Sequence, residues 1–283
     1  MMLPIALVAD TPATLRAEYE QDVARALRPT VPEAAVGTED LGHLPLLVQR
    51  YLRLAGVVGK PRVSNFRVRM HGRIRSGPST RWMPLTAEQH NTVHPPARLF
   101  HLRSAMWGLP VQGYHRFIGT EATMEIRAAG LVPIERAAGK EMNRSETVTL
   151  FNDMCVMAPA TLIDPAIGWE VLDASSVRAT FHHAKHTIHA TLVFSESGEL
   201  VNVISDDRYQ LSPDARSARN VRWSTPITSY REFGTFHLPS TGEGRWHERD
   251  GEYTYIQLTI DEVEYNVVRL RPEALAARPV FIV

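Results

Sequence analysis

One segment of the chain carries two carboxylates at a spacing suited to acid–base chemistry. Glu146 precedes Asp153 by seven residues, close to two helical turns, so both can lie on one side of a helix. Two nearby carboxyl groups differ in pKa when one of them is desolvated, which provides an acid and a base. Asp153 is therefore a candidate catalytic residue, and its neighbour Asn152 is a candidate ligand-binding residue. The alternative is a solvated helix surface on which Glu146 stabilises the first turn.

A second acid–base candidate lies in a stretch that has the pattern of a strand. Asp206 and Arg208 are two residues apart, so they point to the same face of a strand. Such a pair could hold a polar substrate or shift the pKa of the carboxylate, which makes both residues candidate catalytic groups. The alternative, which we favour, is a structural ion pair at a sheet edge.

A third group combines an aromatic ring with a carboxylate and an amide. Trp82, Glu88 and Gln89 lie close together in the sequence and are compatible with a ligand cavity that has an aromatic wall. Pro84 indicates the edge of a sheet or a bulge at this point. A purely structural role explains the segment equally well.

Four histidines between residues 182 and 189 have the pattern H-H-x-x-H-x-x-H, which suggests a metal site. With Ala184–Lys185 as a two-residue turn, His183 faces His186, whereas His182 and His189 lie on the other face. Zinc needs at least three converging ligands, so we predict an exposed polar hairpin and no metal.

Composition narrows the class of protein. Lys+Arg and Asp+Glu both number 31, so the formal net charge is zero, which argues against a nucleic-acid-binding protein. The apolar run at the N-terminus is too short to span a bilayer and lacks the features of a signal peptide. We therefore expect no integral membrane segment and a cytoplasmic protein.

Motifs for the common cofactors and hydrolases are absent from the sequence. It contains no G-x-S-x-G, Walker, G-x-G-x-x-G or H-E-x-x-H pattern. Cys155 is the only cysteine, so no internal disulfide can form, and its place on an apolar stripe indicates a buried, inert thiol. We expect no cofactor.

Three helices are predicted to position these candidates. The strongest helical pattern covers about 142–158, and its apolar positions recur at spacings of three and four: Val148, Phe151, Cys155 and Ala158. Two further helices are predicted before residue 60, at Thr11–Leu27, with Thr11 as a cap, and at Pro45–Ala55.

The rest of the chain alternates with the period of a strand. After Phe66, Val68 and Met70 in the first strand, further strands are predicted at Arg81–Thr92, Arg98–Trp107, Val111–Ile118, Ala122–Ala128, Gly168–Leu172, Val177–His183, His186–Phe194, Leu200–Leu211, Arg222–Phe233, Glu243–Glu248 and Tyr253–Val268. The apolar phase changes within the last strand, which predicts a bulge near Asp261–Glu262. Short connections favour an antiparallel meander and one α+β domain, with a helical segment at 1–60 packed on a sheet domain at 61–283.

Several sequence blocks together resemble an uncharacterised bacterial family, a domain of unknown function. Its members read approximately L-P-x-x-V-x-R-Y-L, W-x-P-x-x-A-x-Q, E-T-V-T-L-x-N-D-x-C, D-R-Y, W-S-T-P, G-x-x-x-Y and Y-N. The matching blocks are Leu44–Leu52, Trp82–Gln89, Glu146–Cys155, Asp207–Tyr209, Trp223–Pro226, Gly251–Tyr255 and Tyr265–Asn266. The family has no assigned activity, so the resemblance implies no particular reaction.

A meander around one inserted helix is also similar to the LolA-like open barrel of periplasmic lipoprotein carriers. This similarity implies a strongly curved sheet that forms an open or half barrel around the helix. The architecture hosts carriers of hydrophobic ligands and at least one class of cofactor-free enzyme. The chain differs from the carriers because it lacks an export signal.

We therefore expect a protein that binds a small hydrophobic or aromatic molecule between the sheet and the helix. Residues predicted to line that cavity, besides those discussed above, are Phe100, Met106, Trp107 and Tyr114. The alternative is a cofactor-independent enzyme that uses Asp, His and Arg side chains in the same cavity. A structural or partner-binding protein is the third possibility and would expose a large apolar patch. The sequence indicates no oligomeric state.

Overall fold

A computed structural model describes residues 14–27, 34–106, 108–128, 132–212 and 217–270 of the chain. It has an α+β fold with one 14-stranded antiparallel sheet and a separate two-stranded ribbon. The helices are α1 (Leu15–Ala26), α2 (Leu46–Leu54), α3 (Lys140–Met157) and the short 3-10 helices η1 (Glu39–Leu41) and η2 (Pro159–Ile163). Among the described residues, no helix combines the length and apolar character needed to cross a membrane.

The strands occupy most of the segments that the alternating pattern predicts. They are β1 (Asn65–Ile74), β2 (Met83–Thr92), β3 (Ala97–Met106), β4 (Leu109–Ile118), β5 (Glu121–Ala128), β6 (Val132–Ala138), β7 (Gly168–Val171), β8 (Ser176–His183), β9 (His186–Phe194), β10 (Leu200–Ser205), β11 (Tyr209–Leu211), β12 (Ala218–Asn220), β13 (Arg222–Ser224), β14 (Ile227–Phe233), β15 (Phe236–Glu248) and β16 (Gly251–Tyr265). The sequence did not predict β6, an edge strand that contains Pro133.

The first and last strands of the large sheet along the chain, β1 and β16, pair with each other near its centre. Its order is β6-β5-β4-β3-β2-β1-β16-β15-β13-β10-β9-β8-β7, and β14 pairs with β15. Most neighbours are consecutive in sequence, as in a meander, but β1 pairs with β16. Arg69 lies opposite Glu262 and Met70 opposite Ile260, so Asp261 is an extra residue. The predicted bulge is confirmed.

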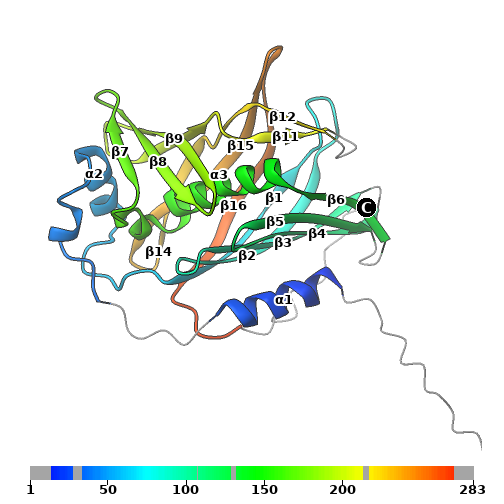
Figure 1. The fold of residues 1–283 in the computed structure, drawn as a ribbon, viewed down its shortest axis with the longest axis horizontal. Helices are drawn as coiled ribbons and strands as arrows, with labels where there is room; N and C mark the ends of the chain where they lie inside the picture. The colour runs from blue at the N-terminus through cyan, green and yellow to red at the C-terminus, as the bar shows by residue number, and fades with distance from the viewer. Residues whose placement is uncertain (1–13, 28–33, 107, 129–131, 213–216, 271–283) are drawn as a thin grey trace, which may run out of the picture.

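Two arms of the sheet lie on either side of α3, with β1–β6 in one arm and β7–β10 in the other (Figure 1). The arms touch at their hairpin turns, where Nε2 of His183 donates a hydrogen bond to the carbonyl oxygen of Gly119 at 2.7 Å. The sheet is neither closed nor strongly curled, so the predicted strong curvature is wrong. The reason is α3, an element about 10 Å across, which fills the space between the arms.

The helix α3 is buried on all sides from Ser145 to Met157. Val148, Phe151 and Cys155 on its predicted apolar stripe are at most 1% exposed. On its polar side, however, Glu146 is only 2% exposed and Asp153 only 3%. The interpretation of this side as a solvated surface is therefore wrong. Because buried charges need partners, the facing strands must supply them.

The other two helices cover different parts of the sheet. α1 packs mainly on β3 and β4, on the face opposite α3 (Figure 1). It begins after Thr14, whose Oγ1 accepts a hydrogen bond from the amide of Ala17, whereas the predicted cap Thr11 lies outside the described residues. α2 packs near the end of α3, where the Tyr51 hydroxyl donates to the carbonyl oxygen of Cys155 at 2.7 Å.

The histidine-rich hairpin between β8 and β9 has the predicted register. His183 lies opposite His186, and His182 lies opposite Thr187, with Ala184 at a φ of 53° in the turn. The imidazoles are thus divided between the two faces of the hairpin. Within the described part of the chain, no group of His, Cys, Asp and Glu side chains is arranged to hold a metal ion.

Candidate functional site

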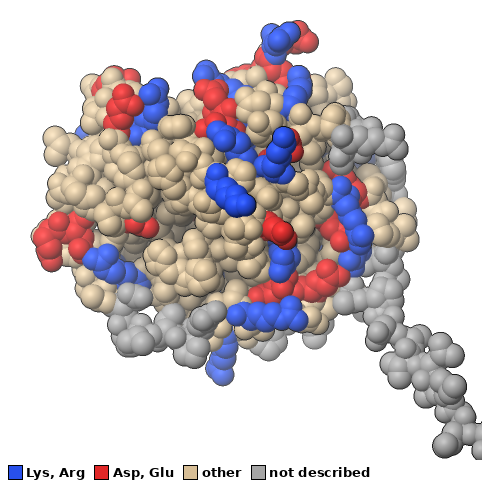
Figure 2. Space-filling view, viewed as in Figure 1, with Lys and Arg blue, Asp and Glu red and all other residues tan. Residues whose placement is uncertain are grey.

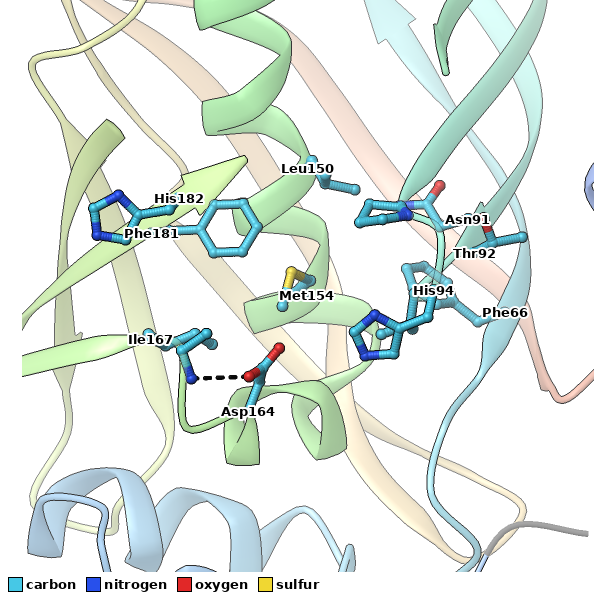
Figure 3. A pocket seen from close by; sticks show the side chains of 13 residues that line it. Phe66, Asn91, Thr92, His94, Leu150, Met154, Asp164, Ile167, Phe181 and His182 are labelled. Atoms are coloured by element: carbon cyan, nitrogen blue, oxygen red, sulfur yellow. Dashed lines mark hydrogen bonds between the residues drawn. The ribbon is translucent and has the colours of Figure 1, made fainter. Parts of the chain in front are cut away.

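A cavity of about 150 Å³ lies against α3, and we call it the α3 cavity. Its walls come from α3, the start of β1, the β2–β3 turn, the end of β8 and the loop after η2 (Figure 3). The lining residues are Phe66, Asn91, Thr92, Val93, His94, Pro96, Leu150, Met154, Asp164, Ala166, Ile167, Phe181 and His182. The cavity therefore depends on segments that are far apart in the sequence.

Most of this lining is apolar. Leu150 and Met154 are one helical turn apart on α3, so both side chains project to the same side of the helix. Figure 3 shows the ring of Phe181 projecting from β8 towards them. The Phe181 ring packs on Phe151, with ring centres 5.2 Å apart, which fixes this wall of the cavity. An apolar molecule would therefore contact rigid side chains of α3 and β8.

A few polar groups also line the cavity, chiefly Asp164 and His94, whereas the imidazole of His182 points away from it (Figure 3). The Asp164 carboxylate accepts a hydrogen bond from the Ala166 amide at 2.9 Å, and its carbonyl oxygen accepts one from the Ile167 amide at 3.1 Å (Figure 3). These bonds fix the loop after η2.

Figure 2 shows acidic and basic side chains interleaved over α1, and a broad area with few of them over β8 and β9.

Next to the cavity, polar side chains of β2, β3 and α3 form a buried network, the Asp153 cluster. It consists of Gln89, Asn91, Arg98, Glu146 and Asp153. Oδ2 of Asp153 accepts hydrogen bonds from Gln89 Nε2 at 2.7 Å, from Arg98 Nε at 2.7 Å and from Asn91 Nδ2 at 3.3 Å. Arg98 also donates to Glu146 at 3.0 Å. Asn91 belongs both to the cluster and to the cavity lining.

Arg98 is one cation between two carboxylates, so the two acids differ in pKa. Burial opposes ionisation of Glu146, but Arg98 and His115 outweigh it and hold the pKa of Glu146 at about 2. Nδ1 of His115 is 3.6 Å from that carboxylate. Burial raises the pKa of Asp153, and Arg98 with the amides of Gln89 and Asn91 offsets only part of the increase. A proton entering the cluster therefore binds Asp153 before Glu146.

The predicted site residues on the inner face of the sheet lie around α3 but not in the cavity lining. Gln89 and Asp153 are bonded to each other, and Phe100 packs edge-on against the ring of His115 at 5.8 Å. Asn152 is buried, and its Oδ1 has no hydrogen-bond partner among the described residues. Asp153 therefore contacts the cluster and neither solvent nor the cavity. A catalytic role for it stays a prediction.

Other predicted ligand-binding residues lie away from α3. Glu88 and Tyr114 are on the outer face beneath α1, where they bond to Arg16 at 2.6 Å and to Asp22 at 2.9 Å. Trp82 precedes β2, and the guanidinium groups of Arg73 and Arg75 lie 4.7 and 4.6 Å from its ring centre. Met106 ends β3, and Trp107 lies outside the described residues.

The predicted pair of Asp206 and Arg208 does not form. Asp206 instead accepts two hydrogen bonds from Arg222, at 2.7 and 2.9 Å. The guanidinium of Arg208 lies over the ring of Trp223 at 4.2 Å. The ion-pair interpretation is wrong because β10 ends at Ser205, so the two residues are not in one regular strand.

Sequence reasoning did not identify the residues that line the α3 cavity. None of the predicted ligand-binding residues that the structure describes is among them. Leu150, Met154 and Phe181 have the ordinary pattern of core residues. The only local signal was the neighbourhood of Asn91 and His94, a polar turn that follows the family block at Trp82–Gln89.

Comparison with protein families gives one match, to a family of unknown function, DUF6544, over residues 34–258. The predicted resemblance to a family without assigned activity is confirmed. A comparison with curated proteins gives no match.

Solved structures with a similar arrangement share little sequence with this chain. A DUF1329 family protein from Desulfovibrio piger has 9% identity and a TM-score of 0.43, with 78% of this chain and 92% of that chain covered. A putative outer membrane lipoprotein-sorting protein domain from Vibrio parahaemolyticus has 9% identity and a TM-score of 0.39, with 71% and 85% covered. A lipoprotein-sorting domain is thus among the similar structures.

Proposed function

We propose that this chain, which belongs to DUF6544, a family of unknown function, binds a small apolar or aromatic molecule in the α3 cavity. The observation that carries the proposal is a cavity of about 150 Å³ whose walls are mostly apolar and come from five separate parts of the fold. Concave, apolar spaces with a few polar groups are typical of small-molecule sites.

The size of the cavity limits the ligand. An apolar cavity of roughly 150 Å³ can hold one benzene molecule, whereas sites for drug-sized ligands measure roughly 300–1,000 Å³. A single ring or a short alkyl chain therefore matches the α3 cavity. A larger ligand would need the arms of the sheet to separate at the contact between His183 and Gly119.

The Asp153 cluster supports this function indirectly. Asp153 and Glu146 both bind Arg98, so α3 is fixed against β3 at two points that are about two helical turns apart. Leu150 lies between these points on the helix and faces the cavity. The cluster thus keeps the apolar wall in place, since buried ionic groups fix a packing arrangement when every partner is present.

A cofactor-independent enzyme is the second candidate, because a carboxylate and an imidazole line the same cavity. Asp164 and His94 provide groups that can accept or donate a proton. In this proposal the acid–base groups are these two and not Asp153, whose Oδ2 is occupied by three donors. If turnover of any bound molecule is found, Asp164→Asn should abolish it, and unchanged turnover would exclude Asp164 as the acid or base.

The binding proposal is tested with benzene as the probe and the methyl resonance of Met154 as the readout. Ala166 lines the cavity but is exposed, so Ala166→Trp should fill the space with little effect on folding. Ala174 is also exposed but does not line the cavity, so Ala174→Trp is the matched control. We expect a saturable shift in the wild type and in Ala174→Trp, and none in Ala166→Trp. No shift in the wild type, or the same shift in both variants, would contradict the proposal.

A further inference from the structure

Arg208 lies between β10 and the β11–β12 ribbon, on a wall of aromatic rings. Its guanidinium carbon is 4.2 Å from the ring centre of Trp223 and 5.6 Å from that of Trp246. The ring of Trp246 in turn stacks on Tyr255, with centres 5.7 Å apart. A guanidinium over an aromatic face keeps its N–H groups directed outward at its edge, where they can meet an acceptor.

Several N–H groups at this wall have no acceptor. Nε and Nη1 of Arg208 are buried and have no hydrogen-bond partner among the described residues. The same holds for Nε1 of Trp223, the indole against which the guanidinium packs. Buried donors without partners are unfavourable, and the cost is larger for a charged group. The wall therefore combines a positive charge with several N–H donors and too few acceptors.

The acidic side chains around Arg208 are bonded to other cations. Asp206 accepts both of its hydrogen bonds from Arg222, and Asp207 is paired with Arg144. Glu146 interacts electrostatically with Arg208 but accepts its hydrogen bond from Arg98 at 3.0 Å. No carboxylate of the described residues therefore forms an ion pair with Arg208.

We propose that Arg208 and Trp223 form a binding site for an anionic oxygen group, a carboxylate or a phosphate. The planar guanidinium offers its unpartnered Nε–H and Nη1–H as donors to the oxygens of such an anion, and the indole N–H can supply a further bond. The site takes an acidic ligand, and it keeps its charge at any physiological pH because a guanidinium does not deprotonate.

This site is separate from the α3 cavity. Tyr209, next to Arg208, is bonded to the first half of α3, because its amide donates a hydrogen bond to Oγ of Ser145 at 2.9 Å. The cavity instead uses Leu150 and Met154, which lie roughly 7–14 Å further along the helix axis. Binding at Arg208 can therefore be tested independently of benzene binding in the cavity, and either proposal can fail alone.

The test follows the indole N–H resonance of Trp223 during titration with inorganic phosphate and, separately, with acetate, at constant ionic strength set by chloride. Trp223→Phe identifies the resonance by its loss. We expect a saturable shift with at least one of the two anions, and the stronger response shows whether the site prefers a phosphate or a carboxylate. A shift that does not saturate with either anion would overturn the proposal.

Three variants separate this site from nonspecific effects of charge. Arg208→Gln removes the cation and should abolish the saturable shift. Arg208→Lys keeps the charge but loses the paired N–H groups, and it should weaken binding about tenfold or more, which remains decisive if Arg208→Gln does not fold. Arg222→Gln removes an exposed cation that pairs with Asp206 and should leave binding unchanged. Equal binding by wild type and Arg208→Lys, or loss in Arg222→Gln, would overturn the assignment to Arg208.

Discussion

Neighbouring residues of β2 point into two different buried environments. Gln89 and Asn91 face α3 and bond to Asp153, whereas Glu88 and His90 face α1 on the other side of the sheet. Both environments are polar and both are closed off from water, since all four side chains are at most 7% exposed. They differ in how charge is balanced.

On the inner face, the charges are retained and paired. Arg98 is 6% exposed and binds two carboxylates, and these bonds join β3 to α3. α3 also packs on strands of both arms of the sheet. Removing any one partner leaves the others buried without compensation, so the inner environment depends strongly on Arg98.

On the outer face, Glu88 is also paired, with Arg16 and Arg67 at 2.6 Å, but two imidazoles beside it are kept neutral by burial. The Tyr19 hydroxyl is 2.6 Å from Nδ1 of His90, and its ring centre is 5.6 Å from that of His101. Burial lowers the pKa of His90 to about 4 and that of His101 to about 4. α1 packs mainly on β3 and β4. The comparison indicates that α3 is held by buried ion pairs, whereas α1 covers two imidazoles whose pKa lies well below the usual value for histidine.

The largest expected effect comes from removing the central cation of the inner environment. Arg98→Met leaves Glu146 and Asp153 buried without their partner, and we expect the free energy of unfolding to fall by about 3–5 kcal/mol. Urea denaturation measures this change. Arg222→Ala, which removes an exposed pair with Asp206, should cost only about 0–1 kcal/mol. Similar costs for both variants would show that the inner ion pairs do not hold α3.

The next effect is the pH dependence of the outer environment. The unfolded chain takes up protons on histidine near pH about 6.5, whereas the folded protein holds His90 and His101 neutral down to about 4. Their contribution to stability is therefore present above pH about 6.5 and is lost as the pH falls towards 4. Each histidine should lower the free energy of unfolding at pH about 5 by about 2 kcal/mol relative to pH about 7.5.

Urea denaturation at both pH values, with the double variant His90→Gln and His101→Gln as the control, measures that difference. The double variant lacks both imidazoles, so its loss of stability between the two pH values should be smaller by about 4 kcal/mol. Hydrogen exchange should show the residues of α1 losing protection before those of α3. An equal pH dependence in the wild type and the double variant would contradict the distinction between the two faces.

A smaller effect is expected from the hydroxyl that joins α1 to β2. Tyr19→Phe removes the hydrogen bond to His90 and leaves the buried Nδ1 of that imidazole without a partner. The free energy of unfolding should therefore fall by about 1–2 kcal/mol. Tyr253→Phe is the control, because the Tyr253 hydroxyl is bonded to Gln210 at a less buried position. Thermal unfolding of both variants gives the comparison, and an equal or larger loss in Tyr253→Phe would count against this bond as an anchor of α1.

The sequence predicted the local elements better than their surroundings. The change of phase around Asp261 revealed the bulge because strand alternation is a local property. The stripe containing Val148 and Phe151 revealed α3 for the same reason. That its polar side is also buried could not be predicted, because the partner of Asp153 is Arg98, on a strand 55 positions away with no local pattern linking the two.

The candidate site was less predictable than the fold. Phe66, Leu150 and Phe181 come from three distant segments, and each alone has the pattern of a core residue. A cavity forms where such side chains leave space between them unfilled. It therefore depends on the shapes of side chains that come together only in the folded structure. The separation of Asp206 from Arg208 also depended on where β10 ends, which alternation alone does not define.

Native mass spectrometry of the purified protein tests the central claim, that the α3 cavity holds a small apolar molecule, most directly. We predict that the wild type and Ala174→Trp carry the same small apolar or aromatic molecule at one copy per chain, and that Ala166→Trp, with its cavity filled, carries none. A wild-type protein that carries no such molecule, or an Ala166→Trp variant that carries it equally, would contradict the claim.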